Sequence, residues 1–201
     1  MRNRFVLAMI AMWPAFACAE LPRGCTQKEN AELAITSCTE FLDAHPADRH
    51  AQSVAYTVRG KALRLLHRDG EAIADFGRAI EADGGWPGPY YERAVALFAA
   101  HETAKAIADY TRVLELEPRD GVYVFRAVAY AELNDASHML ADLQKAIDMN
   151  PRNTFALDML AGYYEHHGDR ARAAAEYRKI LALQPGNKRV LERLKSLEAT
   201  P

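Results

Sequence analysis

Apolar residues recur along this chain three and four positions apart, which is the spacing of one face of an amphipathic helix. Short segments rich in Gly, Pro, Asn and Asp interrupt the pattern at regular intervals, as turns do. The alternation predicts pairs of helices, each pair joined by a tight turn. The expected helices cover residues 51–66 and 70–82, 88–101 and 103–116, 120–133 and 136–149, and 153–167 and 170–183.

The four helix pairs repeat one pattern of small and bulky residues. A marker position at Ala72, Ala106, Met139 and Ala173 recurs after 34, 33 and 34 residues. Twelve residues before each marker stands a small residue, four residues after it a bulky one, and twelve residues after it a helix breaker. The small residues are Gly60, Ala94, Ala127 and Ala161; the bulky ones are Phe76, Tyr110, Leu143 and Tyr177; the breakers are Gly84, Pro118, Pro151 and Pro185.

This pattern resembles the tetratricopeptide repeat (TPR) family, and place 1 of its four copies falls at residues 53, 87, 120 and 154. The resemblance implies an all-α fold, a right-handed α-solenoid of antiparallel helix pairs like the TPR superhelix, with four repeats over residues 51–187. A single pair cannot bury its apolar face alone, so the pairs are expected to stack. Residues 188–201 are expected to form a C-terminal cap helix, because their leucines share one stripe.

Residues 1–19 have the features of a cleaved signal peptide. Arg2 and Arg4 precede an apolar run, and a small-x-small motif at 17–19 precedes Glu20. We therefore expect an exported protein of bacterial type, periplasmic or secreted. A retained anchor and a lipoprotein acylated at Cys18 are the alternatives. The apolar run is shorter than a membrane span requires.

Residues 20–50 are expected to hold an N-terminal segment and the second helix of a half-repeat that has no first helix. Counting back from Ala72 puts Cys38 at place 24, where the other copies have a bulky core residue. A disulfide from Cys38 to Cys25 would bind the leading segment to that helix, and an export signal favours oxidised cysteines. The alternative is two free thiols, one of them buried as a small apolar group.

Composition narrows the classes of function. The chain of 201 residues carries 25 basic and 27 acidic residues, a formal net charge of −2, so we expect no nucleic-acid partner. The seven histidines form no recognisable metal or acid–base constellation, and no Ser–His–Asp set, phosphate loop or HExxH motif is present. We predict that the protein is not an enzyme and needs no metal or cofactor.

A charged pair recurs in three copies, with Arg at place 7 and Asp at place 23. The predicted structural ion pairs are Arg59 with Asp75, Arg93 with Asp109, and Arg126 with Asp142. A planar guanidinium can make two hydrogen bonds to one carboxylate, which favours a bond between the two helices of a repeat. A charged track with a function of its own is the alternative.

The resemblance also implies a binding groove lined by the first helices at places 2, 5, 9, 12 and 13. The groove residues are Thr57, Lys61, Arg64, Tyr91, Val95, Phe98, Val124, Val128, Asp158 and Glu165, with His166 beside them. The groove would be basic at one end, apolar in the middle and acidic at the other. We expect a non-catalytic protein-interaction scaffold that holds a peptide or helix of a partner protein in the periplasm or cell envelope. Self-association into a structural homo-oligomer is the alternative.

Overall fold

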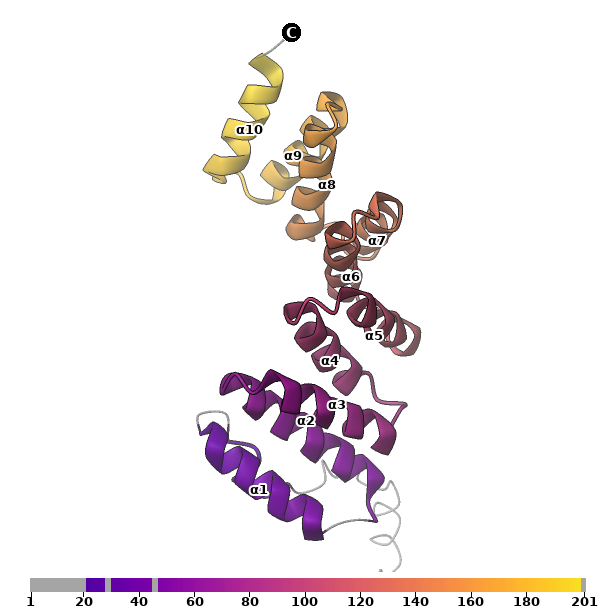
Figure 1. The fold of residues 1–201 in the computed structure, drawn as a ribbon. Coiled ribbons are helices and arrows are strands. Elements are labelled where there is room, and N and C mark those ends of the chain that lie inside the picture. Colours follow the sequence, from indigo (N-terminus) through magenta and orange to yellow (C-terminus); the bar gives the residue numbers. More distant parts are fainter. Residues whose placement is uncertain (1–20, 28–29, 45–46, 200–201) are drawn as a thin grey trace, which may run out of the picture. The chain divides into compact units, whose positions relative to one another are not determined.

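The computed structural model describes residues 21–27, 30–44 and 47–199, and all regular secondary structure within them is α-helical (Figure 1). The helices are α1 (Ala31–Ala44), α2 (Arg49–Leu65), α3 (Asp69–Ala82), α4 (Pro87–Ala99), α5 (Thr103–Leu116), α6 (Asp120–Glu132), α7 (Ala136–Met149), α8 (Thr154–His166), α9 (Arg170–Leu183) and α10 (Lys188–Ala199). The bounds of α2 to α9 agree with the expected helices to within two residues. The expected signal peptide, residues 1–19, and Cys18 lie outside the described residues.

The chain divides into two compact units, Met1–Ala96 and Leu97–Pro201. In the first unit α1 packs on α2, and α2 packs on α3. In the second unit each helix from α5 to α10 packs on its neighbour in sequence. Successive helices run antiparallel within each unit (Figure 1). The predicted fold class, an all-α solenoid of helix pairs, is confirmed.

Small residues at place 8 let the two helices of a pair approach closely. In the first unit this residue is Gly60 on α2, and a Cβ built there would lie 2.6 Å from the ring of Phe76 on α3. In the second unit Ala127 and Ala161 hold the same place and are fully buried. A larger side chain at place 8 would push the bulky residue at place 24 out of the core.

The turn between the two helices of each pair has a residue in the left-handed conformation at place 15. These residues are His67 and His101 (both φ 59°), Asn134 (φ 57°) and Gly168 (φ 75°). The left-handed conformation costs an L-residue roughly 1–2 kcal/mol, and glycine avoids this cost. Two of the seven histidines therefore hold turn positions.

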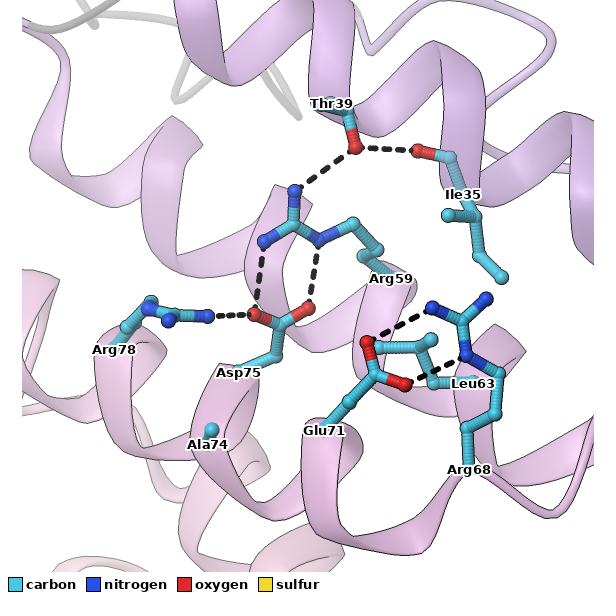
Figure 2. Close-up of a pocket in the computed structure, with 9 residues that line it drawn as sticks. All are labelled: Ile35, Thr39, Arg59, Leu63, Arg68, Glu71, Ala74, Asp75 and Arg78. Atoms are coloured by element: carbon cyan, nitrogen blue, oxygen red, sulfur yellow. Dashed lines mark hydrogen bonds and ion pairs between the residues drawn. The ribbon is translucent and has the colours of Figure 1, made fainter.

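An ion pair joins the two helices of the first repeat (Figure 2). Arg59 on α2 donates from Nε and Nη2 to the two carboxylate oxygens of Asp75 on α3, at 2.7 and 2.8 Å. Its Nη1 donates to Thr39 Oγ1 on α1 at 2.9 Å. One guanidinium thus holds three helices together, and its hydrogen bonds to the Asp75 carboxylate keep its pKa above the ordinary value for arginine.

The second unit repeats this arrangement around Arg126 of α6. Its guanidinium donates to both oxygens of Asp142 on α7 at 2.8 Å and to Thr111 Oγ1 on α5 at 2.9 Å. Thr39 and Thr111 both stand at place 25 of the preceding repeat, a contact that the sequence did not lead us to expect. The remaining predicted pair, Arg93 with Asp109, stays a prediction.

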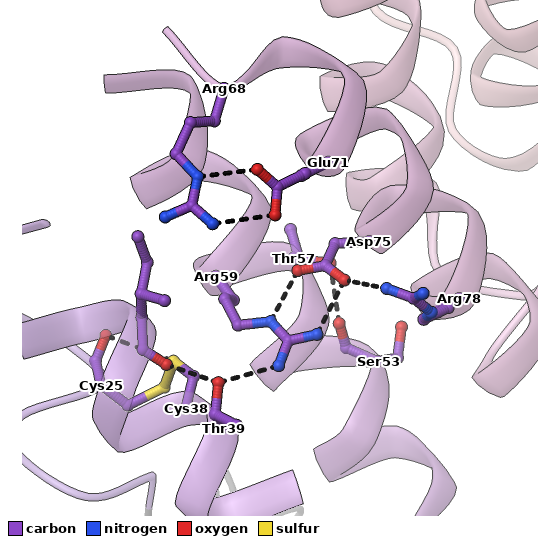
Figure 3. Close-up of polar contacts among 11 residues, drawn as sticks. Cys25, Cys38, Thr39, Ser53, Thr57, Arg59, Arg68, Glu71, Asp75 and Arg78 are labelled. Atoms are coloured by element: carbon purple, nitrogen blue, oxygen red, sulfur yellow. Dashed lines mark hydrogen bonds and ion pairs between the residues drawn. A yellow bond between two sulfur atoms is a disulfide. The ribbon is translucent and has the colours of Figure 1, made fainter. Parts of the chain in front are cut away.

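A disulfide between Cys25 and Cys38 joins the N-terminal segment to α1, with a Cα–Cα distance of 4.8 Å (Figure 3). Both cysteines are fully buried. Beside the bond, a Cβ on Gly24 would lie 2.2 Å from Ser37 Oγ, so the segment passes directly over α1. Leu21 packs on the apolar cluster of Phe41. The segment therefore covers part of the face that a first helix would cover in a full repeat.

The main core of the second unit runs from α6 to the cap helix α10. Its buried members include Leu143, Leu157 and Ile180, and it ends at Val190, which is fully buried on α10. Leu194 and Leu197 of α10 pack against the same cluster. In the part of the chain that the structure describes, no helix is long and apolar enough to cross a membrane.

Reduction of Cys25–Cys38 should destabilise the first unit. The bond closes a loop with a sequence separation of 13, and loops of about this size contribute roughly 3 kcal/mol in the chain-entropy model. We expect dithiothreitol to lower the urea midpoint of the wild-type protein. The double variant Cys25→Ala and Cys38→Ala should show the lower midpoint with and without reductant. Equal midpoints for the oxidised and reduced wild type would contradict a stabilising disulfide.

Substitution at Gly168 should cost backbone strain alone, because no atom lies within 4 Å of a Cβ built there. We expect Gly168→Ala to lower the free energy of unfolding by about 1 kcal/mol. The matched control is Gly162→Ala on the exposed face of α8, which also has open space around the new Cβ. That change should raise stability by roughly 0.5–1 kcal/mol, because glycine is unfavourable inside a helix. Urea unfolding of both variants tests the expected opposite signs.

Breaking the Arg126–Asp142 pair from one side should cost more than removing it from both. Arg126→Leu alone leaves a carboxylate that is 7% exposed without its partner, and we expect a loss of about 3 kcal/mol. Arg126→Leu with Asp142→Leu should recover most of this loss. The chain itself has buried Leu160 at this place in the fourth repeat. A double-mutant cycle by chemical unfolding measures the difference, and additive losses would show that the pair is not coupled.

Candidate functional site

A pocket of about 720 Å³ opens in the first unit beside the N-terminal segment. Three elements besides that segment contribute side chains to it: α1, the C-terminal half of α2, and α4. Its lining residues are Cys25, Thr26, Gln27, Ala34, Val58, Lys61, Ala62, Arg64, Leu65 and Glu92, and we call it the N-terminal pocket. Two residues of the predicted groove, Lys61 and Arg64, are among them.

The cations of this pocket share one carboxylate. Lys61 Nζ lies 2.6 Å from Glu92 Oε1, and Arg64 Nη1 lies 3.8 Å from Glu92 Oε2. The side chain of Lys61 is 56% exposed, whereas that of Glu92 is 17% exposed. The charge that the pocket presents to solvent is therefore mainly positive. The sequence analysis missed Glu92, which stands at place 6, outside the groove places considered.

Apolar groups adjoin these charges. Leu65 at the end of α2 is 64% exposed, and Tyr91 and Val95 on α4 are half-buried. Burial raises the pKa of Tyr91, and the Glu92 carboxylate raises it further, while Lys61 and Arg64 act in the opposite direction. Tyr91 therefore lies within the electric field of the same three charged groups.

The structure removes Thr57 and Val124 from the predicted groove, because both side chains are buried. Thr57 Oγ1 donates to the carbonyl oxygen of Ser53 at 2.8 Å, one helical turn earlier on α2. Val124 belongs to the core cluster that includes Leu143 and Leu157. Place 5 is thus a core position in these two repeats, which their apolar or small side chains allow.

In the second unit, two exposed aromatic residues are absent from the predicted groove residues: Phe125 at place 6 lies outside the groove places, whereas Phe155 holds place 2, which is one of them. Phe98 and Val128 are half-buried. Phe125 on α6 is 45% exposed and stacks on Tyr110 with ring centroids 6.2 Å apart, and Phe155 on α8 is 60% exposed. Phe125 and Phe155 could have been found from the sequence, because each is an aromatic residue at a place where the family's core pattern requires none.

The acidic end of the predicted groove is occupied by the chain's own cap helix. Asp158 Oδ1 lies 2.7 Å from Arg189 Nη2, and Glu165 Oε1 lies 2.8 Å from Arg193 Nη1. The two arginines stand four residues apart on α10, and hence on one helix face. The expectation of an acidic end is therefore wrong, because Asp158 and Glu165 form ion pairs with basic residues of the cap helix.

Glu165 also binds the core of its own repeat. Tyr177 on α9 donates its hydroxyl to Glu165 Oε2 at 2.8 Å. Burial and the bonded Glu165 carboxylate raise the pKa of Tyr177 to about 12. His166, the neighbouring groove candidate, is exposed. This carboxylate thus ties α8 to both α9 and α10.

A second pocket, of about 320 Å³, lies between α1, α2 and α3 (Figure 2). Its charged groups bind one another. Asp75 accepts from Arg59 and, at 2.7 Å, from Arg78, and Arg68 donates twice to Glu71 at 2.8 Å. These pairs support the structural role of the Arg–Asp residues. In the described residues no group of three His, Cys, Asp or Glu side chains is placed to hold a metal ion.

Comparisons with known proteins agree with this architecture. Residues 121–153 match the family model described as "Tetratricopeptide repeat". No curated protein matches the chain.

Solved structures of low sequence identity share the fold. MamA is 20% identical, with a TM-score of 0.70 over 77% of this chain and 89% of that chain. A tetratricopeptide repeat protein from Parabacteroides merdae ATCC 43184 is 19% identical, with a TM-score of 0.71 over 83% of this chain and 65% of that chain. YrrB, a TPR protein with an unusual peptide-binding site, is 16% identical, with a TM-score of 0.66 over 81% of this chain and 82% of that chain. Residues 121–153 therefore match one tetratricopeptide repeat, and the chain shares the fold of solved tetratricopeptide repeat proteins.

Proposed function

We propose that the protein is a non-catalytic protein-interaction scaffold, and that the first unit binds a peptide or helix of a partner protein. The observation that carries this proposal is the N-terminal pocket, where exposed Leu65 adjoins the cations Lys61 and Arg64. An accessible apolar surface rimmed by charge is typical of sites that bind other proteins. YrrB, which shares the fold, has a peptide-binding site of its own, and this supports a similar role here.

The binding surface that we propose in the first unit consists of Lys61, Arg64, Tyr91 and Val95. Tyr91 and Val95 supply apolar contacts, and the two cations orient the ligand by charge. Phe98 and Val128 remain candidates for further contacts in the second unit. Thr57, Val124, Asp158 and Glu165 are not part of this proposal, because they are buried or bound to the cap helix.

The place of action that we propose is the periplasm or another oxidising compartment of the cell envelope. The support is the signal-like pattern of residues 1–19 together with the disulfide between Cys25 and Cys38. Disulfides persist in exported proteins and are rare in the reducing cytosol.

Self-association is a second candidate function, and the exposed aromatic residues of the second unit favour it. Phe125 and Phe155 expose large apolar side chains, as does Leu133 at 50%. Sedimentation velocity over a range of concentrations tests this candidate. A monomer at all concentrations would exclude it, and a dimer that Phe155→Asp dissociates would support it.

Reversing the polarity of the first-unit surface should weaken partner binding without unfolding the protein. The variant Lys61→Glu with Glu92→Lys keeps an ion pair but exposes a carboxylate in place of the 56% exposed ammonium. We expect the affinity for a partner isolated from envelope extract to fall at least about tenfold, which corresponds to about 1.4 kcal/mol. Calorimetric titration of the purified partner measures the change.

The matched control exchanges Lys179 and Glu176 on α9, an ion pair in which the lysine is also 56% exposed and the glutamate 11% exposed. Lys179→Glu with Glu176→Lys should leave the affinity within about twofold. If both exchanges change the affinity equally, or neither does, the binding surface has been assigned to the wrong place.

A further inference from the structure

The two ends of this chain are built differently. At the C-terminal end, α10 continues the repeat register: Val190, at place 3 of what would be a fifth repeat, is fully buried, and Arg189 and Arg193 bind α8. Arg170 of α9 donates to the carbonyl oxygens of Ser196 and Leu197 and so holds the far end of this helix. The helix α10 thus holds the position of a first helix, and it is the last helix of the described residues.

At the N-terminal end, α1 holds the position of a second helix, and within the described residues no first helix precedes it. Its Ala34 and Cys38 stand at places 20 and 24, which pack on the first helix in a full repeat, as Phe76 packs on Gly60. In the described residues before α1, only the turn-rich segment 21–27 covers this face, and the Cys25–Cys38 disulfide binds it there (Figure 3). The segment covers the face around Ser37 and Cys38 and leaves the part nearer Ala34 to the pocket.

The N-terminal pocket therefore lies on the side of α1 and α2 where a first helix packs in a full repeat. Ala34 of α1 and Ala62 of α2 are small and nearly fully buried residues of its lining, and small residues permit the close approach of a helix. Val58 and Leu65 complete an apolar face along α2. Leu65 is 64% exposed and Leu33 is 44% exposed, and these are the most exposed large apolar side chains in the described part of this unit.

Charge defines the chemistry of the occupant. First helices that neighbour each other in this chain bind through opposite charges: Lys61 of α2 binds Glu92 of α4, 31 residues later, and Asp158 of α8 binds Arg189 of α10 at the same separation. The exposed charge at the pocket rim belongs to Lys61 and Arg64. An acidic helix would complement it.

We propose that the N-terminal pocket receives one amphipathic helix of a partner protein, apolar on one face and acidic beside it, which completes the half-repeat. The inference rests on the proposed scaffold function and specifies the form and position of the ligand. The incoming helix places a small residue against Ala34 and Ala62, covers Leu65, and directs its carboxylates to Lys61 and Arg64. The favourable free energy of binding comes from burial of Leu65 and of the apolar face of α2.

The test uses a peptide with a sequence that already serves as a first helix in this chain. Residues 87–99, PGPYYERAVALFA, have a small residue at place 8, apolar residues at places 5, 9 and 12, and an acidic residue at place 6. The peptide carries Arg93→Glu, because the natural segment has one acidic and one basic residue and the proposed ligand is acidic. The blocked, fluorescently labelled peptide is titrated with the folded protein and followed by anisotropy. We expect saturable binding of this peptide to the wild-type protein. The affinity should be at least about tenfold lower for the protein variant Leu65→Asp, and also for a peptide with Ala94→Pro, because proline prevents the peptide from forming the helix.

Leu133→Asp is the matched control, because Leu133 is 50% exposed at the end of α6 and is absent from the pocket. This variant should bind the peptide as the wild type does, and circular dichroism checks the helix content of both variants. No saturable binding, or equal binding by the wild type and Leu65→Asp, overturns the inference.

The outcome is separable from that of the scaffold proposal. If the exchange of Lys61 and Glu92 weakens the envelope partner while Leu65→Asp does not and the peptide fails to bind, the half-repeat is not the site and the scaffold proposal stands. If neither variant weakens the partner, both proposals fail.

Discussion

Close packing of two helices at a small residue is the contact on which every repeat of this chain depends. Gly60 shows the constraint most directly, because even one added carbon would lie 2.6 Å from the ring of Phe76. The bulky residue at place 24 fills the space that the small residue leaves, and the pair then exposes an apolar face that only a neighbouring helix can cover. Stacking follows from this requirement, and so do the special contacts of the first and last described helices, α1 and α10.

The polar contacts within the core serve the same packing. Arg59 and Arg126 each join a second helix of one repeat to both helices of the next, through a threonine and an aspartate. A buried guanidinium is tolerated here because its hydrogen bonds run to a carboxylate and a hydroxyl in fixed positions. Where the threonine is replaced by Gln144, the next repeat has Leu160 in place of the arginine. The threonine is not present before every such arginine, because Gly77 holds its place before Arg93.

The two ends differ in how they satisfy the exposed apolar face. The C-terminal end has a complete cap helix, held by ion pairs and by Val190 in the core. The N-terminal end has a short disulfide-bound segment and a pocket beside it. This asymmetry is why we look for the partner of the proposed scaffold in the first unit. The apolar and charged groups that surround the pocket are those that a further helix would cover.

The sequence by itself determined the all-α class, the positions of the helices and the tetratricopeptide register, because these depend on local periodicity and on small and bulky residues at fixed separations. The register also identified Arg59, Asp75 and Cys38 as residues with structural contacts. Only the tertiary structure decided which groove candidates are accessible. Thr57 is buried, and Asp158 and Glu165 are bound by α10, because the exposure and charge of a side chain depend on neighbours from helices far along the chain. The periodic pattern of one helix does not predict which side chains of distant helices will contact it.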